Sequence, residues 1–218
     1  MLGTVELFKE MLVDELELCS NLSDMNIPLC EIVNMTNDSA LYDVTMTQVV
    51  FIHNLIEAFN YMIESAEWGL STAYLFELNK LINHGLHRGL GLSLRTTEKE
   101  IEGTDWRPDI PSQGAVTQRV YLLNGIMDIE QRALKYFCYI LRTQPFDFYN
   151  ECLALAVANK ELIKGGVGVL YIGKDKMITY KKLLLKFYES GDDFELIEFL
   201  TNLCIVRRML PISVPSEE

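Results

Sequence analysis

Apolar residues recur at helical spacing through most of this 218-residue chain, and one long stretch breaks the pattern. The segment Val49–Trp68 reads VVFIHNLIEAFNYMIESAEW and is apolar on more than one side, which predicts a central helix that begins after Thr45 or Thr47 as N-cap. The same spacing returns in residues 112–143 and again in residues 177–210. Because helices of this kind must bury their apolar faces against one another, the sequence predicts an all-α protein.

The break lies between the third predicted helix and the later ones. That helix runs from about Ser71 to Gly85 or Gly89, where glycine readily adopts the left-handed cap conformation. The segment Leu92–Pro111 then has prolines and, on either side of Gly103, short stretches that favour β structure. This pattern predicts a β-hairpin, or ordered flap, inserted mid-chain in the helical fold.

The chain length fits one main domain with a small addition. Residues 4–21 have helical spacing, and a short apolar stretch, 27–33, precedes a polar break at 34–39. We therefore expect a helical N-terminal extension over 1–45, a main domain over 46–210, and a flexible tail over 211–218.

Composition and charge restrict the classes of partner. The chain is 49% hydrophobic and 23% charged, as in ordinary globular proteins, and carries a net charge of −12. Binding to nucleic acid or to an anionic membrane would need clustered Lys and Arg, which the sequence lacks, so neither is expected. The sequence has no apolar run near the ~20 residues of a membrane span and no pattern of a secretory signal.

The five cysteines are widely spaced, and none is in a CxxC pair, which indicates the reducing cytoplasm. His84 and His87 lie three residues apart, but no carboxylate or Cys completes a ligand set at the usual spacing. We therefore expect no metal site. The sequence leaves the oligomeric state open, a homo-oligomer included.

The order of these features resembles the Fic (Fic/Doc, or Fido) family. The matching elements are GLSLR at 91–95, IEGTDWRPDIP at 101–111, two helices, and QPF at 144–146 before a further helix. The resemblance covers Val49 to Cys204 and implies a helical fold whose members transfer AMP from ATP to a protein hydroxyl. In the family, the flap aligns the target polypeptide by adding a strand to it. The residues implied here are Ile101, Gly103, Thr104, Asp105 and Trp106.

The family signature is His-Pro-Phe-x-(Asp/Glu)-Gly-Asn-(Gly/Lys)-Arg, and this chain has QPFDFYNEC in its place. Pro145, Phe146 and Asn150 match. The general-base His is Gln144, whose amide cannot accept a proton near neutral pH, although a branch of the family carries Gln here. The metal-holding acid is Phe148, with Asp147 one residue early.

The phosphate-binding half of the signature departs further. Tyr149 and Glu151 occupy the two positions for small residues, where backbone N–H groups would approach the phosphates. A Glu151 carboxylate ~4 Å from a phosphate would repel it by about 4 kcal/mol at an effective dielectric near 20. Cys152 and Leu155 replace the two arginines. The resemblance thus predicts a pseudoenzyme or polypeptide-binding module without a cofactor.

The residues of this loop are its candidate site. Gln144, Asp147 and Asn150 would hold any remaining chemistry, and the nucleotide-binding remnant is Pro145, Phe146, Tyr149, Glu151 and Cys152. The alternative is an active nucleotidyl- or phosphotransferase that uses ATP and Mg²⁺, with Asp147 or Glu151 recruited as base or metal ligand. A third hypothesis is a purely structural role of the protein, with the N-terminal helices as an interaction surface.

Ordinary structural roles explain several of the same residues. Asn150 and Glu151 suit the N-cap and first turn of a helix, and Cys152 suits a core position. Glu57 lies where many Fic proteins carry an inhibitory glutamate, but its Arg partner would be Leu155, which favours an ordinary helix residue. Trp106 is either exposed for polypeptide capture or packed on the domain.

Overall fold

The computed structural model describes residues 1–87 and 92–208; the predicted tail, 211–218, and Gly89 lie outside this part. Within it the helices are α1 Leu2–Glu10, α2 Leu12–Leu22, α3 Leu29–Thr36, α4 Met46–Glu64, α5 Thr72–Asn83, α6 Gln113–Asn124, α7 Ile129–Thr143, α8 Asn150–Lys164, α9 Met177–Ser190 and α10 Phe194–Leu203. Two short strands, β1 Val169–Leu170 and β2 Ile205–Val206, pair antiparallel, with Val169 opposite Val206. The all-α prediction is confirmed. In the described ranges, no helix combines the length and apolar character needed to cross a bilayer.

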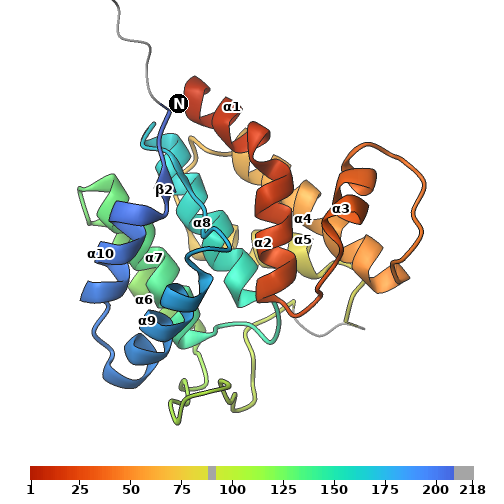
Figure 1. The fold of residues 1–218 in the computed structure, drawn as a ribbon. Coiled ribbons are helices and arrows are strands. Elements are labelled where there is room, and N and C mark those ends of the chain that lie inside the picture. The colour runs from red at the N-terminus through yellow and green to blue at the C-terminus, as the bar shows by residue number, and fades with distance from the viewer. Residues whose placement is uncertain (88–91, 209–218) are drawn as a thin grey trace, which may run out of the picture.

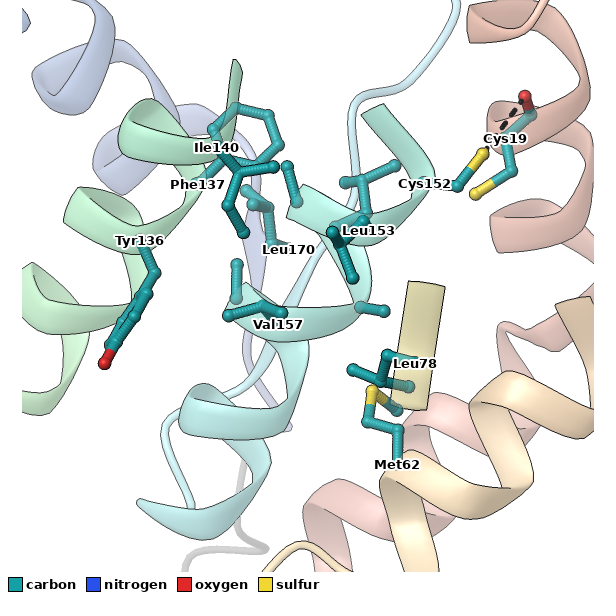
Figure 2. Packing of buried hydrophobic residues seen from close by; sticks show 14 of the residues in the cluster. Cys19, Met62, Leu78, Tyr136, Phe137, Ile140, Cys152, Leu153, Val157 and Leu170 are labelled. Atoms are coloured by element: carbon teal, nitrogen blue, oxygen red, sulfur yellow. Dashed lines mark hydrogen bonds between the residues drawn. The ribbon is translucent and has the colours of Figure 1, made fainter. Parts of the chain in front are cut away.

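Helix α8 lies at the centre of the fold (Figure 1). It packs along α7 on one side and against α4 and α5 on the other. Figure 2 shows Leu153 and Val157 of α8 between Phe137 and Ile140 of α7 and a second group from α4 and α5. Because α8 is buried on nearly every side, its apolar residues form the middle of one continuous core.

The buried charges of α8 are paired. Lys160 is fully buried and donates to the carbonyl oxygens of Ala66 and Trp68, after the end of α4. Its neighbour Glu161 accepts from Arg132 Nε at 2.6 Å. These contacts satisfy charges that would otherwise strongly oppose burial, and they fix α8 relative to α4 and α7.

Two helices begin where the sequence predicted, each after a side-chain cap. Thr45, rather than Thr47, caps α4 through a full capping box with Gln48, and Ser71 caps α5 by accepting from the Tyr74 N–H. Helix α5 ends at Asn83, and Gly85 has the left-handed φ of +69° expected after a helix end.

The N-terminal helices differ from the prediction. The helix expected over 4–21 is two helices that meet at Met11, a break that no Gly or Pro announces. Helix α3 continues to Thr36, through the start of the predicted polar break. Helix α2 contacts α3, α4 and α8, so this segment packs directly against the main helices.

Of the two alternatives expected for residues 92–111, a β-hairpin or an ordered flap, the structure has the ordered flap. The paired strands are β1 and β2, whereas the described residues 92–111 form turns and extended chain without a strand. The segment lacks a backbone ladder because the guanidinium of Arg95 donates hydrogen bonds to the carbonyl oxygens of Thr97, Pro108 and Asp109. These carbonyls lie on both limbs of the segment, so a side chain holds the limbs where a backbone ladder was expected. We call residues 96–111 the flap.

Candidate functional site

The loop Gln144–Tyr149 joins α7 to the buried start of α8. Both of its end residues are left-handed, with φ of 43° at Gln144 and 55° at Tyr149. Asn150 closes the loop: its side chain donates to Phe146 O at 2.7 Å and accepts from Phe146 N–H at 3.1 Å. Asn150 is therefore not the N-cap that we expected, since Tyr149 holds that position without a side-chain cap.

Gln144 occupies the general-base position and is bound within the protein. Its side chain is buried, and Nε2 donates to Leu141 O at 3.0 Å and to Glu151 Oε1 at 3.1 Å. The backbone oxygen of Gln144 accepts from Arg95 Nε at 2.7 Å. The amide nitrogen and the backbone oxygen thus have structural partners, whereas the buried Gln144 Oε1 accepts no hydrogen bond within the described residues. The Glu151 carboxylate lies in the first turn of α8.

Phe148 and Tyr149 form an aromatic cluster with His87 and Phe51. The Phe148 ring stacks on His87 at 3.6 Å between centroids, and the Tyr149 ring lies 4.9 Å from Phe51. The Tyr149 hydroxyl is 3.2 Å from His87 Nε2. Burial lowers the pKa of His87, against an opposing effect from Asp147, and raises the pKa of Tyr149 to about 12. Sequence reasoning did not assign His87 to this cluster, because only the fold brings it to the loop.

Cys152 lies in the core, as the ordinary interpretation predicted. It is fully buried, 3.2 Å from Ser23 Oγ, and its thiol faces Cys19 of α2 (Figure 2). Leu155, at the position of the second arginine, is also fully buried. Cys152 therefore supports packing between α8 and α2, and Leu155 belongs to the core.

The other predicted residues do not gather at one point. Asp147 accepts from Lys99 Nζ through its backbone oxygen, and the Asn150 side chain is used within the loop. Glu57 lies on the exposed face of α4, and no ion pair to it is found in the described ranges. Residues 1–87 and 92–208 contain no group of three His, Cys, Asp or Glu side chains that could hold a metal ion.

The flap is held to the domain by its own side chains. Arg95 is 1% exposed and joins the flap to the carbonyl oxygens of Gln144 and Thr143 as well as to those of the flap. Trp106 packs on the domain: its Nε1 donates to Arg142 O at 3.3 Å, and the Arg142 guanidinium lies 3.9 Å from the ring centroid. The packed alternative for Trp106 is thus the observed one.

The flap has a turn at its tip and, just before the turn, a free backbone edge. Thr104 N–H donates to Ile101 O, and Gly103 has a φ of +82° that suits glycine. Asp105 is exposed beside this turn. Residues 98–100 make no backbone–backbone hydrogen bond to any other part of the described chain. This edge is available to a further strand.

A pocket of about 390 Å³ lies beside the loop and the flap. The flap contributes Ile101 and Glu102, α8 contributes Glu151, and α9 and the end of α2 complete the walls. The remaining lining residues are Asn21, Leu22, Asp24, Tyr180, Lys181, Leu184, Leu185 and Tyr188. Tyr188 lies beside Gln144, whose hydrogen bond opposes the rise in the Tyr188 pKa caused by burial. We call this the flap pocket; Glu151, the hydrogen-bond partner of Gln144, lies in its wall.

Comparison with solved structures identifies the fold. Fic-1 (residues 134–508) of C. elegans superposes with a TM-score of 0.72 at 12% identity, over 89% of this chain and 60% of that one. This chain has a Fic-type fold. A Fic domain containing signaling protein of Bacteroides thetaiotaomicron gives a TM-score of 0.70 at 15% identity, over 84% of this chain and 74% of that one. No protein-family model and no curated protein matches the sequence.

These comparisons establish the Fic fold alone. The chain spans 60% of the C. elegans structure, and identities of 12% and 15% carry no activity from one protein to the other. The function must therefore be argued from the residues of this chain.

Proposed function

We propose that this protein is a Fic-fold polypeptide-binding module that does not transfer AMP. The hydrogen bond between Gln144 Nε2 and Glu151 Oε1, at 3.1 Å, carries the proposal. It joins the general-base position to one of the small-residue positions, so an internal amide–carboxylate pair replaces two parts of the AMP-transfer site.

The electrostatics at the start of α8 support the loss of nucleotide binding. A helix N-terminus favours a negative charge, and here Glu151 supplies that charge from within the helix. A phosphate brought to the same place would meet this carboxylate, with Cys152 in place of the neutralising arginine. The aromatic cluster of Phe148, Tyr149, His87 and Phe51 also holds the loop by packing, without a ligand.

The flap supports binding of a polypeptide. Its edge at residues 98–100 has free backbone groups, and the flap pocket opens beside Ile101 and Glu102. An extended peptide would add a strand at this edge and direct alternate side chains toward the domain. Arg95 would hold the edge in place before binding, which reduces the entropy lost on association.

The alternative of an altered transferase receives less support. It required Asp147, Asn150 and Glu151 to converge in an open pocket, and of these three only Glu151 lines the flap pocket. We also propose a location in the reducing cytoplasm, because the five cysteines are free thiols.

Amide NMR with an extended peptide tests the proposal. The probe is a series of peptides, acetyl-Thr-Val-Thr-X-Thr-Val-Thr-amide, in which X is lysine, arginine, norleucine or glutamate. Their β-branched residues favour the extended conformation. Binding by strand addition should shift the amides of residues 98–102 and slow their hydrogen exchange, while α6 amides such as Tyr121 stay unchanged. The proposal fails if no peptide of this series, at millimolar concentration, affects the flap amides.

A further inference from the structure

We propose that the flap pocket binds a basic side chain, lysine or arginine, of the polypeptide that lies along the flap. This inference rests on the proposed function and adds the chemistry of the partner. It begins with the charges around the pocket. Asp24, Glu102 and Glu151 line it, against a single lysine, Lys181.

The cations near the pocket do not cancel this charge. Lys99 lies close enough to Glu151 for the two charges to interact, but its Nζ donates to Asp147 O. Arg95 is committed to backbone carbonyls. With Lys99 included, three carboxylates face two lysines, so the pocket region keeps a negative charge that attracts a cation.

A buried hydroxyl in the pocket wall has the capacity to accept a further hydrogen bond. Tyr180 lines the pocket, its side chain is fully buried, and its hydroxyl has no hydrogen-bond partner among residues 1–87 and 92–208. Buried hydroxyl groups are normally hydrogen-bonded, so an orphan in a pocket wall requires an explanation. Glu151 lies near enough to raise the pKa of Tyr180, although burial is the main cause of the rise. An ammonium or guanidinium group between Glu151 and Tyr180 would supply the donor.

The rest of the wall suits the stem of such a side chain. Leu184 and Leu185 of α9 are half-buried, and Ile101 of the flap and Leu22 of α2 complete an apolar passage. Long basic side chains bury their methylene groups along apolar surface and place the charge at the polar end. A peptide strand at residues 98–100 would start next to Ile101, so one side chain of that strand could enter the pocket.

The test compares peptides that differ only at X in acetyl-Thr-Val-Thr-X-Thr-Val-Thr-amide. Lysine and arginine at X should shift the amides of Leu184, Leu185 and Tyr188 together with those of the flap. Norleucine, which has the lysine stem without the charge, and glutamate should shift the flap amides alone and bind about tenfold more weakly.

Protein variants locate the cation. Glu151→Gln should weaken the lysine peptide about tenfold and Glu102→Gln about twofold, because Glu102 is exposed. Tyr180→Phe should weaken it without lowering stability. Glu100→Gln is the matched control: it removes the same charge from the flap but lies outside the pocket lining, and it should leave the affinity unchanged.

The outcomes separate the two proposals. Equal affinity for lysine and norleucine, with flap shifts for both, overturns the basic-side-chain site and leaves strand addition intact. Shifts of the α9 amides that need a basic X but occur without flap shifts support the cation site and overturn strand addition. If no peptide shifts either set of amides, both proposals are wrong.

Discussion

Replacing Arg95 with Met should detach the flap and destabilise the whole domain. Arg95 is 1% exposed and donates to five backbone carbonyls, two of them, Pro108 O and Gln144 O, in fully buried hydrogen bonds. A buried acceptor left without a hydrogen-bond donor costs about 1–3 kcal/mol, so two such acceptors cost roughly 2–6 kcal/mol. Burial lowers the pKa of Arg95, which shows that its buried charge is itself unfavourable. Removing that charge therefore offsets part of the loss. We therefore expect a loss of about 2–4 kcal/mol in the free energy of unfolding.

Thermal melting followed by far-UV circular dichroism measures this loss. At about 2–4 °C per kcal/mol for a chain of this size, Arg95→Met should lower the Tm by roughly 5–15 °C. The matched control is Arg107→Met, which breaks an exposed flap ion pair with Glu100 and should change the Tm by less than about 2 °C. An Arg95→Met protein that melts within about 2 °C of the wild type would refute the role assigned to this arginine.

Three further substitutions test the buried polar groups. Tyr180→Phe removes an unpaired buried hydroxyl, so the free energy of unfolding should stay the same or rise by about 1 kcal/mol; a loss above 1 kcal/mol would contradict this. Burial raises the pKa of Glu15, so the folded state holds a proton that the unfolded state releases above pH 4.5. The free energy of unfolding should therefore fall as the pH rises from 4.5. The Glu15→Gln variant should show a flatter fall in a series of melts at different pH. Burial lowers the pKa of His87, so the unfolded state takes up its proton at a higher pH than the folded state does. The stability of the wild type should therefore fall as the pH drops below 6.5. The His87→Phe variant, which preserves the stacking on Phe148, should lose that pH dependence in the same melts.

The sequence predicts those parts of the fold that depend on local chemistry. Thr45 and Ser71 act as N-caps because their side-chain oxygens accept from N–H groups three residues on, a signal contained in a few neighbouring residues. The unbroken apolar character of 152–158 likewise predicts a buried helix. The break at Met11 has no such local signal.

The site could be predicted only in part. The substitutions at Gln144 and Glu151 are visible in the sequence, but their mutual hydrogen bond depends on left-handed residues at both ends of the loop. The sequence could not decide between a hairpin and an ordered flap, because the hydrogen bonds from Arg95 to the flap carbonyls are tertiary contacts. The flap pocket is lined by residues from α2, α8, α9 and the flap. Because these segments lie far apart in the chain, no local sequence pattern predicts the pocket.

Our central proposal is that the loop Gln144–Tyr149 and the start of α8 do not accept ATP. The most direct measurement is thermal melting of the purified protein with millimolar ATP, with and without Mg²⁺. A ligand at 100 times its Kd adds about 2.7 kcal/mol to the free energy of unfolding, a shift of roughly 5–10 °C for this chain. We predict no shift in either condition. A magnesium-dependent shift of that size would contradict this proposal and restore the transferase hypothesis.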